Sequence, residues 1–328
     1  MSILIVGAGA TGGFFGARLA QAGRDVTFLV REGRAEVLRQ RGLRVTGPGG
    51  ATGATVLAEP RLVTAGQLTR SGPADVVLVT VKADGLAAAA GQLGPAVGPD
   101  TAVVPVLNGI RHLELLNRAF GARRVLGGVA LISAYLDGDG DVSLLTEAVS
   151  LRIGAQDRQR APLVERAGQQ LSGAGFHLEV SGNIVADMWS KWAFIAAAGA
   201  VTCLLRGTVG EIVAADGGEQ AARAIIDKAL AVERAAGYPV PDPWVRQTVG
   251  LLTAAGSEFA SSMYRDLRSG RPVEVEPILG DLTAVAREQR LPTPLLDAAT
   301  VALRVYGQGV YGQVRATSGS NRNGGTAS

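Results

Sequence analysis

The chain has few of the residues that build disulfide bonds and metal centres. Its 328 residues include one cysteine, Cys203, and two histidines, His112 and His177. A single cysteine excludes an internal disulfide and is typical of a reducing compartment, so we expect a cytoplasmic location. One thiol and two imidazoles are too few for a His/Cys metal cluster, and no metal site is predicted.

Aromatic residues, net charge and long apolar runs are scarce as well. Aromatic side chains make up 5% of the chain and the formal net charge is only +3, with scattered basic residues. This argues against nucleic-acid binding. The longest apolar run, 192–205, is too short to cross a bilayer. No positively charged segment precedes the first predicted strand, so we expect neither a secretory signal nor a membrane partner.

The N-terminus carries the strongest motif. Residues 3–6 are apolar and predict a buried strand, and Gly7, Gly9 and Gly12 follow with the spacing G-x-G-x-x-G. The first glycine permits a tight turn, the second lets the backbone approach a pyrophosphate, and the third allows close helix packing. A helix over 13–22 presents its N-terminal N–H groups to the phosphate. We predict a dinucleotide site; the alternative is a turn that binds nothing.

The end of the second predicted strand indicates which dinucleotide binds. This strand covers 25–30, and Arg31 follows it, nineteen positions after Gly12. A carboxylate at this place holds a ribose 2′-hydroxyl, whereas an arginine accommodates a 2′-phosphate. Arg31 therefore predicts NADPH. The alternative is an exposed arginine that pairs with Glu32.

Further strands predict an open α/β sheet. The apolar run 75–82 is typical of a parallel strand buried on both faces, and its carboxyl end brings Lys82 to the edge where ligands bind. A strand over 101–107 is followed by Asn108, which we expect near the nicotinamide ribose or the substrate, unless Asn-Gly is simply a turn. Extra strands or a small hairpin are expected over 43–57.

The β-rich region 125–180 completes this domain, with a last strand over 176–180. Its acidic turn 137–141 lacks the other ligands of an EF-hand loop and is expected to be a solvated turn. His112, on a predicted helix, is expected to be a surface or capping residue rather than a base. We predict that the Rossmann NADP-binding domain spans residues 1–182.

Residues 183–316 change to a helical pattern. Breaks that contain Gly or Pro separate the predicted helices, which cover 184–205, 209–215, 218–236, 244–267, 275–289 and 295–311. The predicted fold is thus an α/β Rossmann domain followed by an all-α substrate and catalytic domain. Residues 317–328 are poor in apolar side chains and are expected to be disordered.

One lysine stands out in the helical half. Lysines are very few, and Lys191 lies at the start of the most apolar helix. A charge there is costly unless it snorkels, pairs or takes part in chemistry. Burial lowers the pKa of a lysine toward working pH, which suits an acid that protonates a carbonyl oxygen. Downstream, Ser261 and Ser262 are candidates to bind a substrate carboxylate and Glu274 to orient the lysine, although both serines are also acceptable as helix-face residues.

These motifs together resemble the ketopantoate reductase (2-dehydropantoate 2-reductase) family. The resemblance covers nearly the whole chain and rests on the ordered segments 7–12, 31, 80–82, 107–109, 189–192, 261–263 and 270–274. It implies a Rossmann domain and a helical domain with the active site in the cleft. The implied activity is NADPH-dependent reduction of 2-dehydropantoate to (R)-pantoate in pantothenate and coenzyme A biosynthesis.

The resemblance also implies roles for individual residues. Lys191 would be the general acid and Glu274 its carboxylate partner. Ser262 would bind the substrate carboxylate, and Asn108 would lie near the nicotinamide and the substrate. The cofactor-binding residues that it implies are Gly7, Gly9, Ala10, Thr11, Gly12, Arg31, Lys82 and Asn108.

The sequence departs from the family pattern at two positions. The family carries asparagines four and eight residues after the catalytic lysine, where they contact polar substrate groups, and this chain has Ile195 and Gly199. Losing such a hydrogen bond costs about 1 to 3 kcal/mol. The alternatives are therefore reduction of a more hydrophobic 2-oxo acid or related carbonyl, or a non-catalytic NADP(H) sensor. The apolar helical half permits a homodimer.

Overall fold

The computed structural model describes residues 1–48, 55–70, 72–157 and 161–320. The chain divides into two compact units, Met1–Met188 and Trp189–Ser328. The division falls inside one continuous helix, α6 (Ile184–Leu205), a little beyond residue 182.

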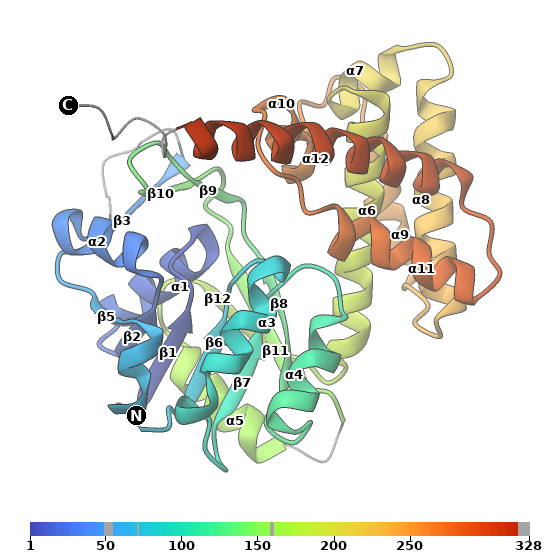
Figure 1. The fold of residues 1–328 in the computed structure, drawn as a ribbon. Helices are drawn as coiled ribbons and strands as arrows, with labels where there is room; N and C mark the ends of the chain where they lie inside the picture. The colour runs from blue at the N-terminus through green and yellow to red at the C-terminus, as the bar shows by residue number, and fades with distance from the viewer. Residues whose placement is uncertain (49–54, 71, 158–160, 321–328) are drawn as a thin grey trace, which may run out of the picture. The chain divides into compact units, whose positions relative to one another are not determined.

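Five parallel strands form the central sheet of the first unit (Figure 1). In spatial order they are β5 (Arg61–Val63), β2 (Asp25–Leu29), β1 (Ser2–Val6), β6 (Val76–Val79) and β7 (Ala102–Pro105). Every residue of β6 and β7 is buried, as their continuous apolar sequences predict for parallel strands covered on both faces. This order is that of a Rossmann sheet, so the predicted α/β fold is confirmed.

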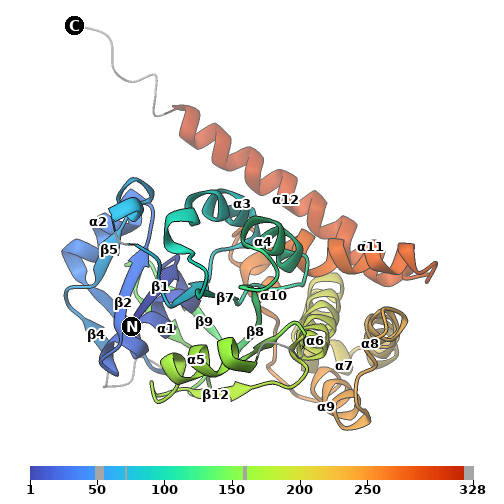
Figure 2. The ribbon, with the colours of Figure 1, turned by 90° about the horizontal axis from the view of Figure 1, so that it is seen from below.

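Helices cover both faces of this sheet (Figure 2). Side chains of α1 (Ala10–Gln21) and α5 (Ala161–Leu171) join the apolar cluster on one face. Side chains of α3 (Ala83–Gln92) and α4 (His112–Phe120) join the cluster on the other. The carboxyl ends of the strands are therefore the part of the sheet that remains for a ligand.

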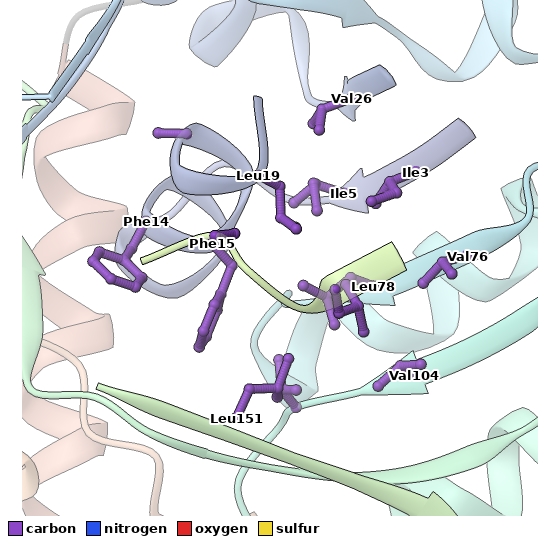
Figure 3. Packing of buried hydrophobic residues seen from close by; sticks show 14 of the residues in the cluster. Ile3, Ile5, Phe14, Phe15, Leu19, Val26, Val76, Leu78, Val104 and Leu151 are labelled. Carbon is purple, nitrogen blue, oxygen red and sulfur yellow. The ribbon is translucent and has the colours of Figure 1, made fainter. Parts of the chain in front are cut away.

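The core on the α1 side consists of aliphatic residues from the sheet and aromatic residues from the helix (Figure 3). Ile5 and Leu78 are fully buried there. Phe15 of α1 meets Phe176 edge to face, with ring centroids 4.8 Å apart. This geometry is favourable for aromatic pairs and anchors α1 on the sheet.

Two smaller sheets complete the first unit. Their strands are β4 (Thr55–Leu57), β3 (Leu43–Thr46), β10 (Val142–Leu144) and β9 (Ala134–Leu136) in one, and β12 (His177–Val180), β11 (Ser150–Ala155) and β8 (Leu126–Leu131) in the other. The antiparallel pair β3 and β4 confirms the hairpin expected over 43–57. The expectation that 176–180 is the last strand of the main sheet is wrong, because β12 pairs with β11 instead.

The acidic segment after β9 is a turn. Asp137 Oδ1 accepts hydrogen bonds from the backbone N–H groups of Asp139 and Asp141, at 3.0 and 2.9 Å. The guanidinium of Arg41 pairs with both Asp139 and Asp141. The carboxylates are thus engaged with the turn and with α2 (Glu32–Arg41).

The second unit is helical. After α6 it contains α7 (Val209–Ala214), α8 (Gly218–Ala235), α9 (Asp242–Leu252), α10 (Ser262–Arg268), α11 (Asp281–Glu288) and α12 (Pro294–Ser320). Helix α8 packs against α7, α9, α11 and α12. Residues 317–320 of the expected tail belong to α12, and 321–328 lie outside the described residues.

Two sequence predictions about helices are wrong. The single helix expected over 244–267 is interrupted after Leu252, because the backbone of Ser257 and Phe259 accepts hydrogen bonds from the start of α7. His112 is buried at the start of α4, with 6% of its surface exposed, rather than lying on the surface.

Helix α6 is longer than the apolar run that the sequence suggested. Its 22 residues are enough, by length and composition, to cross a membrane. However, 67% of its most apolar window is buried inside the protein. That burial is the behaviour of a core helix.

Candidate functional site

The three motif glycines between β1 and α1 have different surroundings. Gly7 has a φ of +95°, in the region that favours glycine. A Cβ on Gly12 would lie 2.0 Å from the carbonyl oxygen of Gly7 and 2.2 Å from Thr80 Oγ1, so no side chain fits. A Cβ on Gly9 would meet no atom within 4 Å. The tight turn and close packing that the spacing predicts are present, and the backbone at Gly9 borders open space.

The start of α1 adds hydrogen-bond donors to this open space. The helix begins at Ala10, earlier than predicted, with Gly9 as its N-cap. The first N–H groups of a helix, here those of Ala10, Thr11 and Gly12, have no acceptor within the helix. Together with the positive end of the helix dipole, they fit the pyrophosphate of a dinucleotide.

Arg34 supports the glycine loop, and sequence reasoning missed it. Its Nε donates to the carbonyl oxygen of Ala8 at 2.9 Å, and its Nη1 donates to that of Gly140 at 2.8 Å. Its Nη2 is buried without a hydrogen-bond partner among the described residues. The available signal was position, since Arg34 lies one turn after Arg31 on the helix that follows β2.

The two predicted adenosine-end residues cap neighbouring helices. Arg31 is the N-cap of α2 and Lys82 the N-cap of α3, and both are exposed. Arg31 Nη2 lies 3.3 Å from the place that a Cβ on Gly85 would take, so its guanidinium reaches the first turn of α3. Asn108 is half-buried in the bend after β7, next to Gly109 with a φ of +79°. The first unit thus brings Arg31 to the segment that carries Lys82.

In the second unit, Lys191 and Glu274 act on each other electrostatically. Lys191 lies on α6 and Glu274 precedes the π-helical turn Glu276–Gly280; both are half-buried. Desolvation lowers the pKa of Lys191 to about 8, while the negative charge of Glu274 raises it and offsets part of that effect. A lysine with this pKa holds and releases a proton near neutral pH.

The two candidate serines differ in their environment. Ser261 is buried and caps α10, because its Oγ accepts from the backbone N–H of Tyr264 at 3.1 Å and lies 2.7 Å from Thr202 Oγ1. Ser262, the first residue of α10, is exposed. The fold therefore uses the hydroxyl of Ser261 internally, and Ser262 presents its side chain at the surface of the unit.

The wall of α6 beyond Lys191 is apolar. Ile195 is half-buried, and Gly199 is buried against Met263. A Cβ on Gly199 would lie 2.6 Å from Met263 Sδ. Met263 thus occupies the space that a side chain at position 199 would need.

The residue before Lys191 is bonded to a buried acid. Ser190 Oγ donates to Glu233 Oε1 at 3.0 Å, and Glu233 Oε2 has no hydrogen-bond partner in the part of the chain that the structure describes. Glu233 is 1% exposed. Desolvation raises its pKa to about 7, although the hydrogen bond from Ser190 and the charge of Arg234 oppose the shift.

Glu233 makes the stability of the protein depend on pH. Its folded pKa is raised above the unfolded value of 4.5, so its stabilising effect is complete below pH 4.5 and is lost as the pH rises through 7. We expect Glu233→Gln to be more stable than the wild type at pH 8, by at most about 3 kcal/mol, and to lose this advantage at pH 5. Thermal unfolding at both pH values measures it. The exposed Glu219, changed to Gln, is the control and is expected to show no such dependence; an equal advantage of Glu233→Gln at both pH values would contradict the prediction.

A Rossmann sheet with this glycine loop, followed by a helical unit with a lysine of lowered pKa, defines the class of dinucleotide-dependent oxidoreductases. Models of that class match the sequence. The model of ketopantoate reductase PanE/ApbA matches residues 3–158, and the model of its C-terminal part matches 183–307. The chain belongs to the ketopantoate reductase family and is an oxidoreductase of the 2-dehydropantoate 2-reductase type.

Similar proteins match along nearly their whole length. An uncharacterized oxidoreductase, YkpB, of Bacillus subtilis (strain 168) is 32% identical, over 93% of this chain and 99% of the relative. A 2-dehydropantoate 2-reductase of Mesorhizobium japonicum is 28% identical, over 93% and 97%. The crystal structure of 2-dehydropantoate 2-reductase from Geobacter metallireducens GS-15 superimposes with a TM-score of 0.82 at 27% identity, over 93% and 99%. The family and the fold are thereby established.

Proposed function

We propose that the protein reduces a 2-oxo acid to the 2-hydroxy acid with NADPH, and that 2-dehydropantoate, giving (R)-pantoate for pantothenate and coenzyme A biosynthesis, is its substrate. The observation that carries the proposal is the half-buried Lys191, whose pKa of about 8 balances desolvation against the charge of Glu274. We also propose a cytoplasmic location, in keeping with the single, buried Cys203.

The proposed roles divide between the two units. In the first, the glycine loop and the start of α1 hold the pyrophosphate, Arg31 and Lys82 hold the adenosine end, and Asn108 lies near the nicotinamide. When bound, the reduced nicotinamide supplies a hydride to the carbonyl carbon. In the second, Lys191 Nζ gives a proton to the carbonyl oxygen, and the charge of Glu274 keeps the ammonium form available.

Arg31 is proposed to select NADPH over NADH. Arg31→Ala removes a charge-assisted bond to the 2′-phosphate, so we expect KM for NADPH to rise about tenfold or more and KM for NADH to change less than about twofold. Initial rates with each coenzyme measure this. Arg39→Ala is the control, since Arg39 is exposed on the same helix and pairs with Glu32 at 3.7 Å. Equal changes for both coenzymes would refute the selection.

The packing of Met263 favours a second candidate substrate. With Met263 against Gly199 and Ile195 one turn before it, α6 offers no polar side chain at the two positions that bear asparagines in the family pattern. A polar substrate group left without a partner costs about 1 to 3 kcal/mol. A 2-oxo acid with a more apolar side chain is therefore the second candidate.

A substrate profile tests both candidates. NADPH oxidation is followed with 2-dehydropantoate and with 2-oxo acids of increasing apolar bulk. The highest kcat/KM for 2-dehydropantoate supports the first candidate, and a tenfold preference for an apolar acid supports the second. Ile195→Asn is expected to shift the profile toward 2-dehydropantoate. No turnover of any 2-oxo acid with either coenzyme would sink the reductase proposal and favour a non-catalytic NADP(H) sensor.

A further inference from the structure

The turn of α6 around Lys191 is tied to the segment that carries Glu274. Trp192, directly after Lys191, is 1% exposed and is among the largest fully buried side chains of the chain. Its indole Nε1 donates a hydrogen bond of 2.8 Å to the carbonyl oxygen of Ile278. Ile278 lies in the π-helical turn Glu276–Gly280, two residues after Glu274. One buried bond therefore connects the two segments that carry the acid and its carboxylate partner.

The π-helical turn is also held from the side of α12. Arg304 makes two bonds to Glu276, Nε to Oε1 at 2.7 Å and Nη2 to Oε2 at 2.6 Å. Gly280 leaves room for this pair, since a Cβ there would lie 2.3 Å from Glu276 Oε2. The Oγ1 of Thr283 donates to the Gly280 carbonyl at 3.0 Å. The turn is thus a fixed element, and π-helical turns occur often at functional sites.

The turn that carries Lys191 is fixed in the same manner. The Trp189 ring stacks on Tyr238 with centroids 5.4 Å apart, and Ser190 is bonded to Glu233. These contacts orient α6 toward α8 and the segment after it. The Trp192 bond is the contact among these that runs directly to the Glu274 segment.

We propose that Trp192 is a positioning residue, which sets the distance between Lys191 and Glu274 through its hydrogen bond to the carbonyl of Ile278. This inference deepens the proposed function and rests on it for its kinetic consequence. Trp192 itself takes no part in proton transfer. A bond of this kind matters because a small misplacement of a catalytic group lowers the rate strongly.

Trp192→Phe keeps an aromatic ring and removes the N–H donor. With the turn released from α6, we expect the influence of Glu274 on Lys191 to weaken. The charge of Glu274 raises the pKa of Lys191, so the Lys191 midpoint is expected to fall by about 0.5 to 1 unit. In the reductase assay we expect kcat to fall about tenfold, with KM for the substrate nearly unchanged.

The Lys191 midpoint is measurable without turnover. The chain has three lysines, Lys82, Lys191 and Lys228, so protein labelled with 13Cε-lysine gives few signals, and Lys191→Ala assigns the relevant one. The matched control is Trp244→Phe, because Trp244 Nε1 has no hydrogen-bond partner among the described residues. It is expected to leave the midpoint and kcat as they are in the wild type.

A double-variant cycle decides the mechanism. In a Glu274→Gln background, Trp192→Phe is expected to leave the Lys191 midpoint where it is, because the charge that it acts through is absent. An unchanged or raised midpoint in Trp192→Phe alone, or the same fall in both backgrounds, overturns the proposal. If Trp192→Phe does not fold, 3-benzothienylalanine at position 192 removes the N–H with nearly the same shape. Should the wild type reduce no 2-oxo acid, the proposed function fails, whereas the titration still tests the coupling.

Discussion

Lys191→Ala is expected to lower kcat at least about 100-fold, with a folded protein that still binds NADPH. General acid catalysis by a placed side chain contributes about 10²- to 10⁴-fold, and alanine leaves no group to protonate the carbonyl oxygen. The residues proposed to hold the coenzyme lie in the other unit, so its dissociation constant is expected to stay within about twofold. Steady-state kinetics and a fluorescence titration with NADPH measure the two quantities.

The pH profile gives the sign of the Lys191 effect. The acid acts in its protonated form, so kcat for reduction is expected to be level below pH 8 and to fall about tenfold per unit above it. Lys191→Ala loses this limb. Lys228→Ala is the matched control, since Lys228 is a half-buried lysine of the same unit, on α8. A variant at 191 with wild-type kcat would mean that the lysine has no role in proton transfer.

Gly9→Ala and Gly12→Ala are expected to fail for different reasons. At Gly9 the added methyl group meets no protein atom, so the variant is expected to fold with a nearly unchanged Tm. The methyl group stands where the pyrophosphate would approach, so NADPH affinity is expected to fall more than about tenfold. At Gly12 the methyl group collides with the backbone of Gly7, and we expect a loss of several kcal/mol of stability, about 3 or more.

The comparison of these two variants separates binding from folding. Thermal unfolding without coenzyme measures the first consequence, and titration with NADPH the second. Gly23→Ala is a poor control, because Gly23 has a φ of +76° and strain would confuse the result. Gly91→Ala is the better one, since a Cβ there has open space within α3. If Gly9→Ala binds NADPH as tightly as the wild type, the glycine loop is not the pyrophosphate site.

Much of the fold could be predicted from local patterns. The strands β1 and β6 are continuous apolar runs, and the apolar sequence of α6 gives its ends at Ile184 and Leu205 as the structure has them. The break after Leu252 could not be predicted, because it depends on hydrogen bonds from Val209 and Gly210, which are distant in sequence. The burial of His112 likewise depends on tertiary packing that its neighbours in sequence do not indicate.

The candidate site was predicted where side chains carry the chemistry and missed where the backbone does. Lys191 and Glu274 have charges that stand out in their surroundings. Arg34 and Trp192 bind carbonyl oxygens, which every residue has, so no pattern of side chains marks their partners. The position of Met263 against Gly199 was hidden for a similar reason, since only the folded unit brings α10 to α6.

The bonds of Arg34 constrain how the coenzyme preference of this protein can be redesigned. Arg31 and Arg34 are one helical turn apart, and both are obvious targets for a designer who wants an NADH enzyme. Arg31 is exposed and can be exchanged without disturbing the core. Arg34 joins Ala8 to Gly140, so exchanging it would release the loop that the new coenzyme also needs. Libraries for coenzyme switching should therefore vary position 31 and keep the arginine at 34.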